Sequence, residues 1–84
     1  MSATDVARRA AEQLGALTGR PVEGVLGLER NEKGWHVTLE LLELRRIPQT
    51  TDVLASYEVT VDEKGELVGY HRIRRYARNQ VEEP

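Results

Sequence analysis

Apolar residues in the first part of the chain recur at intervals of three and four, the spacing of one face of a helix. Ser2 or Thr4 can cap the start of this helix, and Gly19 followed by Pro21 ends it, because proline cannot continue the hydrogen-bond ladder. The stripe is mostly alanine, which predicts that the helix lies close against a sheet. The same close packing would explain why a glycine, Gly15, occurs within the helix. The members of the stripe are Val6, Ala7, Ala10, Ala11, Leu14 and Leu17.

The rest of the chain alternates between apolar and polar residues with a period of two, which predicts strands. The alternation slips after Leu41, because Leu42 and Leu44 are both apolar and Glu43 is not. One extra residue produces such a slip, so we expect a β-bulge near Leu41–Leu42. In the first strand, Leu26 shares a face with Val22 and Leu28, which we expect to be the core side of the sheet. Strands are expected over 22–30, 35–44, 53–61 and 67–76, with tight turns at 31–34 and 62–65 and a loop at 47–51.

Strands joined in sequence by short connections form an antiparallel sheet, and the chain is too short for parallel crossovers. The predicted fold is therefore α+β, with one N-terminal helix packed across a four-stranded antiparallel sheet. We expect a single domain over 1–84 with a flexible tail at 79–84. The second face of the sheet is partly apolar, which favours a partner or a homodimer on that face. Its apolar residues are Val25, Leu42, Leu44, Leu54 and Val68.

Composition narrows the function. The chain has 84 residues and no cysteine, which excludes disulfides and thiolate catalysis. No apolar run approaches the roughly 18 residues of a membrane helix, and the start lacks the pattern of a signal peptide. These features lead us to expect a cytoplasmic protein without membrane contact.

Residues that carry catalytic chemistry are few. His36 and His71 lack a nucleophile or further ligands beside them in the sequence, so we interpret both as solvated strand residues. Glu40 and Glu43 lie three apart on a strand and are interpreted as surface charges. No glycine-rich phosphate loop or serine elbow is present. The sequence therefore favours a protein that is not an enzyme and needs no cofactor or metal.

The most distinctive feature is a basic run at 70–78, which carries four arginines and no acid although the formal net charge of the chain is −2. On an unbroken strand, alternate residues from Tyr70 to Tyr76 line one face. Arg45 and Arg46 extend this strip from the loop that contains Pro48. The predicted partner-binding residues, which we call the arginine–tyrosine strip and its loop, are Arg45, Arg46, Pro48, Tyr70, Arg72, Arg74, Arg75, Tyr76 and Arg78.

Three interpretations of the strip remain open. It can dock a carboxylate-rich protein, or bind phosphates and stacked bases. Alternatively, its arginines pair with Glu40, Glu58 or Glu66 across the sheet. The net charge argues against nucleic acid as a partner. In the neighbouring loop, we expect Asp52 to accept backbone donors or to pair with an arginine.

Five segments carry a resemblance in combination. They read TGRPVEGV at 18–25, GWHV at 34–37, ELRRIP at 43–48, TDVLASYEV at 51–59 and GELVGYHRIRRY at 65–76. Together they resemble the gas vesicle protein O family, with a match that runs from about Val6 to Arg78. The predicted fold is also similar to cystatin-like and PepSY-type modules, an analogy that transfers no site.

The resemblance implies a non-enzymatic accessory protein of gas vesicle formation, cytoplasmic and associated with gas vesicles. It implies other gas vesicle proteins as partners. Together with the apolar second face and the basic run, it leads us to expect that they are bound through the sheet face and the arginine–tyrosine strip, in a chaperone-like role. The family has no recognised catalytic residues to carry over. The alternative is a small regulatory nucleic-acid-binding protein that uses the basic C-terminal strand; its affinity would fall steeply with salt.

Overall fold

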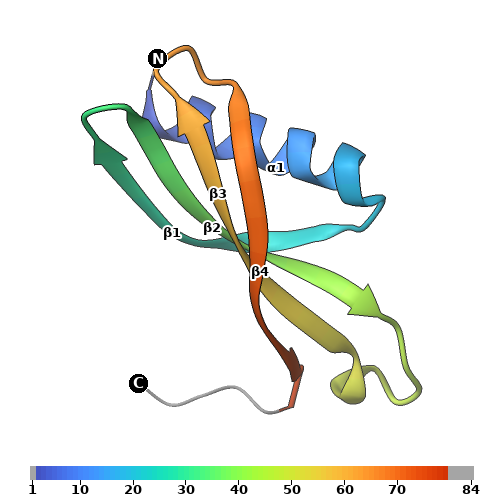
Figure 1. The fold of residues 1–84 in the computed structure, drawn as a ribbon. Helices are drawn as coiled ribbons and strands as arrows, with labels where there is room; N and C mark the ends of the chain where they lie inside the picture. The colour runs from blue at the N-terminus through green and yellow to red at the C-terminus, as the bar shows by residue number, and fades with distance from the viewer. Residues whose placement is uncertain (1, 80–84) are drawn as a thin grey trace.

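The structure, a computed structural model, describes residues 2–79. Its four strands form one antiparallel sheet in the order β1-β2-β3-β4, and α1 lies across one face (Figure 1). This confirms the predicted α+β fold. The tail expected at 79–84 lies outside the described residues, except for Asn79. The elements are α1 (Ala3–Thr18), β1 (Val22–Asn31), β2 (Gly34–Leu44), the 3₁₀ helix η1 (Gln49–Thr51), β3 (Val53–Asp62) and β4 (Leu67–Ala77).

Both ends of α1 follow the predicted signals. The Ser2 hydroxyl accepts a hydrogen bond from the Asp5 backbone N–H at 3.2 Å, which satisfies one of the free donors of the first turn. At the other end, Gly19 adopts a left-handed conformation with φ of 69° and donates to the Gly15 carbonyl at 2.8 Å. The helix boundaries are therefore local consequences of the sequence.

The face that α1 buries is shorter than the apolar stripe. Leu17 is 59% exposed, so the packed face ends one turn earlier than predicted. Close packing also does not explain Gly15, because an added Cβ would lie 3.6 Å from the nearest atom, an ordinary contact distance. The side chains of α1 that are fully buried against the sheet are Val6, Ala10 and Leu14.

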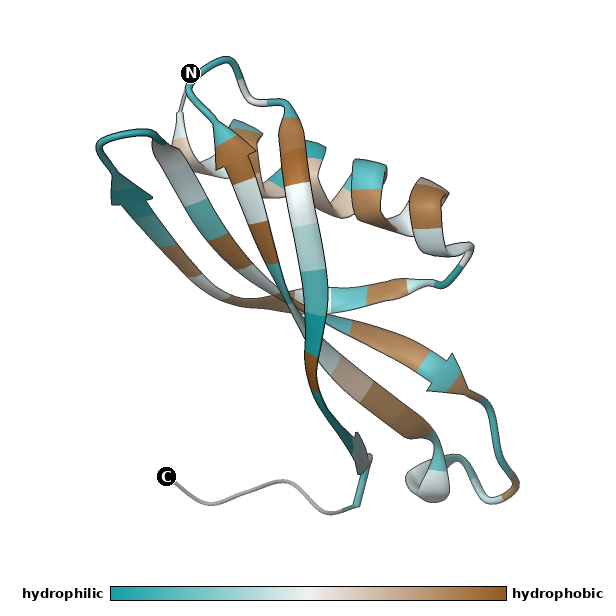
Figure 2. Ribbon diagram, viewed as in Figure 1, coloured by the Kyte–Doolittle hydropathy of each residue, from teal (hydrophilic) through white to brown (hydrophobic). Residues whose placement is uncertain are grey.

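The main core lies between α1 and the two central strands. Every second residue of β2 and β3 points toward the helix, as the alternation predicted, and Figure 2 shows the apolar positions along these strands. Trp35 and Leu67 are partly buried at its margin. The buried strand residues of this core are Val37, Leu39, Leu41, Ala55, Tyr57, Val59 and Val61.

The strands contain more irregularities than the sequence revealed. The β2–β3 register shifts between Leu42 and Leu44, which confirms the bulge expected near Leu41–Leu42. Two further shifts occur in β1, on either side of Val25. Each extra residue reverses the alternation, so Leu26 leaves the core side and is 54% exposed. Our assignment of Leu26 to the core side was therefore wrong.

The two predicted tight turns are confirmed and lie at the same end of the sheet. Asp62 Oδ1 accepts hydrogen bonds from the backbone N–H groups of Lys64 and Glu66 at 2.9 and 3.0 Å. Gly34 has φ of 148°, and a Cβ there would lie 2.1 Å from the Val61 carbonyl oxygen, so only glycine fits. No helix among residues 2–79 is long and apolar enough to cross a membrane.

The helix covers only part of the sheet. α1 lies over the half that carries the two turns, which we call the covered half, whereas the other ends of β2, β3 and β4 extend beyond it (Figure 1). In this extension Leu42 and Leu54 are buried on the side of the sheet away from α1 and do not belong to the main core. We call that side of the sheet the open face.

Candidate partner-binding site at the arginine end

The extension of the sheet beyond α1 collects most of the arginines in the chain, and we call it the arginine end. Seven arginines and four carboxylates give it a formal charge of +3, although the whole chain carries −2. A local excess of cations of this kind attracts anionic groups. The arginines are Arg20, Arg45, Arg46, Arg72, Arg74, Arg75 and Arg78, and the carboxylates are Glu23, Glu40, Glu43 and Asp52.

One buried carboxylate organises three of these arginines. The Glu43 side chain is only 5% exposed, and Oε1 lies 3.0 Å from Arg72 and 3.4 Å from Arg75. Oε2 lies 3.3 Å from Arg20 Nε, and Arg20 also donates to the Glu43 carbonyl. Our interpretation of Glu43 as a surface charge was therefore wrong. The β2 bulge places this side chain inward, where it joins β2, β4 and the connection after α1.

A second cluster fixes the loop between β2 and β3. Asp52 is buried; Oδ1 accepts the Arg46 backbone N–H at 2.7 Å, and Oδ2 accepts from Arg78 at 3.2 Å. Arg78 also contacts Glu23 at 3.0 Å. The Arg46 N–H and the Arg78 guanidinium hold the pKa of Asp52 below its usual range, against the opposing effect of burial. Both expected roles of Asp52 are thus confirmed.

The arginine–tyrosine strip does not lie on one face. Arg74 pairs with Ser56 and Arg72 with Tyr57, so Ile73 is an extra residue in β4. This bulge reverses the alternation, which the sequence pattern did not reveal. Arg72 therefore lies on the α1 side of the sheet. The prediction of a single continuous face was wrong.

The two halves of the strip differ in their contacts. On the α1 side, the Tyr70 ring lies 6.2 Å from the Tyr57 ring, measured between centroids. On the open face, the Tyr76 hydroxyl donates to Glu40 Oε2 at 2.6 Å, and the Arg74 guanidinium lies 5.3 Å from the Tyr76 ring centroid. Burial, followed by the Glu40 carboxylate, raises the pKa of Tyr76 to about 12. Tyr76 is therefore a neutral hydrogen-bond donor at physiological pH.

Carboxylates other than those expected neutralise the strip. Arg72 and Arg75 pair with Glu43 rather than with Glu40, Glu58 or Glu66, although His71 lies 4.0 Å from Glu58. Pairing across the sheet, one of the three interpretations, therefore accounts for part of the basic run. The arginine end keeps a net positive charge, because its arginines outnumber the carboxylates that they share.

The loop after β2 presents the most exposed part of the arginine end. Ile47 is fully exposed at 101%, and Arg45, Arg46 and Pro48 are exposed beside it. Within residues 2–79, no carboxylate lies within ion-pair distance of the Arg45 or Arg46 guanidinium. The loop is nevertheless anchored from inside, because the Thr51 hydroxyl donates to the Pro48 carbonyl at 2.7 Å. Its apolar and basic tip is thus held in place.

A shallow hollow joins this loop to β4. Arg46 and Arg75 line it and none of its lining residues is acidic, so it suits an anion such as a carboxylate. The sequence did not single out Arg20 and did not predict the inward orientation of Glu43, because their contact depends on a bulge and on the path of the chain after α1. No group of three His, Asp or Glu side chains in the described part of the chain could hold a metal ion. The hollow is lined by Arg46, Thr51, Val53, Arg75, Tyr76 and Ala77.

Comparison with known proteins shows which family this chain resembles. The model of the family described as gas vesicle synthesis protein GvpO matches residues 1–82. The chain is 52% identical to gas vesicle protein O of a Streptomyces species over 75 residues, which cover 89% of this chain and 59% of the relative. It is 35% identical to gas vesicle protein O1 of Halobacterium salinarum over 75 residues, 89% of this chain and 63% of the relative.

A third relative, gas vesicle protein O of Haloferax mediterranei, is 35% identical over 81 residues, which cover 95% of this chain and 58% of the relative. The chain thus spans about three fifths of the length of the curated relatives that it matches. No solved structure matches it, and the likeness to cystatin-like and PepSY-type modules is not confirmed.

Proposed function

The chain belongs to the family of gas vesicle synthesis protein GvpO, and from this premise we propose that it is a non-enzymatic accessory protein of gas vesicle formation. It binds another gas vesicle protein through the arginine end and acts in the cytoplasm at the growing vesicle. The names of the three relatives support the connection with gas vesicles. The surface chemistry of the arginine end supports binding rather than catalysis.

One observation carries the choice of surface. Arg45 and Arg46 directly precede a fully exposed Ile47, and neither guanidinium lies within ion-pair distance of a carboxylate among the described residues. An exposed aliphatic side chain beside two exposed cations fits a partner surface that offers carboxylates next to an apolar depression. The partner is therefore a gas vesicle protein with an acidic docking surface.

The alternative, a regulatory nucleic-acid-binding protein, has weaker support. Phosphate binding depends on cations that can replace counterions, but Arg72 and Arg78 already contact Glu43 and Asp52. A stacking platform needs aromatic rings along one surface, whereas Tyr70 and Tyr76 lie on opposite sides of the sheet. These contacts favour a protein partner.

The test replaces the chromosomal copy in vesicle-forming cells with a charge-reversal variant. We expect Arg45→Glu combined with Arg46→Glu to abolish vesicles while the melting temperature of the purified chain stays unchanged, because both side chains are exposed. The matched control is Lys33→Glu combined with Lys64→Glu, which changes the charge equally at the exposed turns and should leave vesicles normal. Normal vesicles in the arginine variant would contradict the proposal.

The same variants identify the partner. A tagged chain is recovered from nuclease-treated lysate, and the proteins that accompany it are identified. We expect another gas vesicle protein with the unchanged chain and with the lysine control, but not with the arginine variant. If nucleic acid accompanies the chain in untreated lysate and no protein remains after nuclease, the alternative function replaces the proposed one.

A further inference from the structure

The hollow beside the loop lies on the same side of the sheet as α1, beyond the part that the helix covers (Figure 1). Ala55 is a core residue on the α1 side, and it pairs with Arg75 of β4. Two residues further along, Val53 pairs with Ala77. Because alternate residues of a strand share a face, Val53, Arg75 and Ala77 all lie on the α1 side. These three residues and Arg46 line the hollow, which therefore belongs to the α1 side.

The Glu43 cluster adds further cations to this side. Arg72 donates to Glu43 Oε1 at 3.0 Å. Arg20 and Arg75 lie 3.3 and 3.4 Å from the same carboxylate through Nε. One carboxylate neutralises one of three cations, so the cluster keeps a formal charge of +2 after these ion pairs are counted. Each guanidinium has five N–H donors, and all three side chains are about half exposed, so donors remain for a second anion.

The charge excess of the arginine end is concentrated on this side. The three arginines of the Glu43 cluster, Arg46 and the one carboxylate give it a formal charge of +3. The other charged residues of the arginine end balance one another, with as many carboxylates as arginines. These are Arg45, Arg74 and Arg78 with Glu23, Glu40 and Asp52. An anionic partner is therefore drawn to the α1 side.

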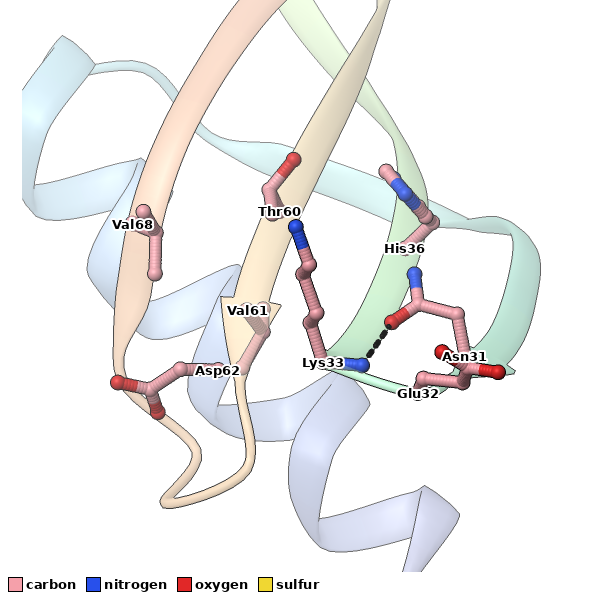
Figure 3. Close-up of a pocket in the computed structure, with 8 residues that line it drawn as sticks. All are labelled: Asn31, Glu32, Lys33, His36, Thr60, Val61, Asp62 and Val68. Carbon is pink, nitrogen blue, oxygen red and sulfur yellow. Dashed lines mark hydrogen bonds between the residues drawn. The ribbon is translucent and has the colours of Figure 1, made fainter.

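A hollow beside the turns has the opposite balance. Figure 3 shows Lys33 there together with Glu32 and Asp62, which gives a formal charge of −1. None of the described residues that line it is an arginine. Val61 and Val68 line it as well, so apolar character does not distinguish the two hollows, but charge does. The turns are therefore the place for a control variant.

The hollow on the α1 side suits carboxylates that a protein carries. Arg46 and Arg75 supply planar guanidinium groups, which match a carboxylate with two parallel hydrogen bonds. Val53 and Ala77 supply methyl groups beside them. Leu44 pairs with Val53, so it lies on the same side, and it is 46% exposed. A protein segment with acidic and aliphatic side chains complements both kinds of group, whereas a phosphate backbone complements only the cations.

We propose that this surface, which we call the carboxylate site, binds an acidic segment of the partner protein. One carboxylate of the segment lies between Arg46 and Arg75, and a second lies over the rest of the Glu43 cluster. Because the carboxylate site rests on the proposed function, its partner is a gas vesicle protein. The site adds the chemistry of the segment and places it on the part of the sheet that α1 leaves uncovered (Figure 1).

The test measures the binding of a labelled peptide of four Glu-Glu-Leu repeats to the full chain, by fluorescence anisotropy at physiological salt. We expect saturable binding. Arg75→Gln should weaken it about fivefold or more, because Arg75 belongs to both the Glu43 cluster and the hollow. The matched control is Arg30→Gln, which removes the same charge from an exposed arginine over the Trp35 ring beside the turns. The control should bind as the unchanged chain does.

Two further measurements locate the contact. Arg75→Lys keeps the charge but lacks the planar fork, so we expect it to bind about twofold or more weaker than the unchanged chain. Melting temperatures establish that each variant keeps its fold. In the unchanged chain, NMR signals of the arginine Nε–H groups need no variant. On addition of the peptide, the signals of Arg72 and Arg75 should shift, whereas that of Arg30 should stay in place.

An oligothymidylate with the same number of negative charges distinguishes carboxylates from phosphates. We expect it to bind more weakly than the peptide, because it offers no aliphatic side chain to Leu44 and Val53. Equal or tighter binding of the oligothymidylate would overturn the assignment to an acidic protein segment. Absence of peptide binding would overturn the carboxylate site, as would equal weakening by Arg75→Gln and Arg30→Gln.

The outcomes separate this site from the proposed function. If Arg45→Glu combined with Arg46→Glu abolishes vesicles but the peptide does not bind, the proposed function stands and the carboxylate site is wrong. If the peptide binds at Arg75 but vesicles stay normal in that double variant, the site stands and the proposed function is wrong. In vesicle-forming cells, Arg75→Gln should reduce the partner recovered with the tagged chain. Unchanged recovery would overturn the assignment of the partner to this site.

Discussion

Different interactions hold the strands together in the covered half and at the arginine end. In the covered half, α1 and the central strands bury aliphatic side chains completely, as Leu39 does at 0% exposure. The arginine end lies beyond the reach of α1, and there the carboxylates Glu43 and Asp52 connect the strands through arginines. Apolar burial depends little on salt or pH, whereas ion pairs depend on both. The two regions should therefore respond differently to the same perturbations.

The two regions also differ in how much of their side chains is exposed to solvent. The core residues of the covered half are buried within the chain, so substitutions of these residues change stability. The arginine end leaves Arg45, Arg46 and Ile47 exposed to solvent, so under the proposed function substitutions there change binding rather than stability. A small protein with one thin core can expose such residues without opening the core.

The strongest way to test this comparison is a pair of aliphatic truncations. Leu39→Ala removes a fully buried side chain from the covered half and should lower the free energy of unfolding by about 2–5 kcal/mol. Ile47→Ala removes a fully exposed side chain from the arginine end and should change it by less than about 0.5 kcal/mol. Urea unfolding of both variants measures the difference. Equal losses would mean that the Ile47 loop is packed in solution.

A smaller effect is expected where the arginine end has its own buried group. Glu43→Gln leaves Arg20, Arg72 and Arg75 facing one another without a carboxylate. Removing one partner from a fully buried pair costs about 3–5 kcal/mol. Because these arginines are about half exposed to water, we expect about 1–2 kcal/mol, or a melting temperature lower by about 5–10 °C.

Salt dependence distinguishes this effect from a loss of packing. Added salt should bring the Glu43→Gln variant closer to the unchanged chain, because it screens the remaining arginines. Glu63→Gln, at the exposed turn, is the matched control and should have no measurable effect. A loss that does not change with salt would show that Glu43 acts through shape rather than charge.

The sequence predicted the covered half better than the arginine end, for a physical reason. Helix caps, tight turns and alternation are local signals, so the boundaries of α1 and the core faces of β2 and β3 followed from neighbouring residues. The bulge near Leu42 was also detectable, because it breaks an otherwise regular apolar pattern. Where polar residues occupy both faces, an extra residue leaves no such trace.

The β4 strand illustrates this limit. From Tyr70 to Arg75 five of six residues are polar or aromatic, so the alternation carries no phase that the bulge at Ile73 could disturb. The sequence placed these arginines on one strand but could not divide them between the two sides of the sheet. Nor could it pair Arg72 with Glu43, because that contact joins residues 29 apart.

The smallest effect concerns the titration of single carboxylates in the two regions. Asp52 at the arginine end and Asp5 in the first turn of α1 both have a pKa below the usual range, Asp52 through Arg46 and Arg78, and Asp5 through Ser2 and Arg8. An unfolded aspartate titrates near 3.9. Each ionised carboxylate therefore stabilises the fold above that pH, and the contribution is lost as the pH falls through the lowered pKa.

The two aspartates should nevertheless differ, because Asp52 is buried and Asp5 has a side chain that is 50% exposed and screened by water. Unfolding measured between pH 5 and 2 should show a shallower loss of stability for Asp52→Asn than for the unchanged chain, whereas Asp5→Asn should follow the unchanged chain closely. The change stays small because protonated Asp52 still accepts the Arg46 N–H. If Asp5→Asn reduced the loss of stability at low pH more than Asp52→Asn does, the acid sensitivity would come from the covered half. The proposed difference between the two regions would then be wrong.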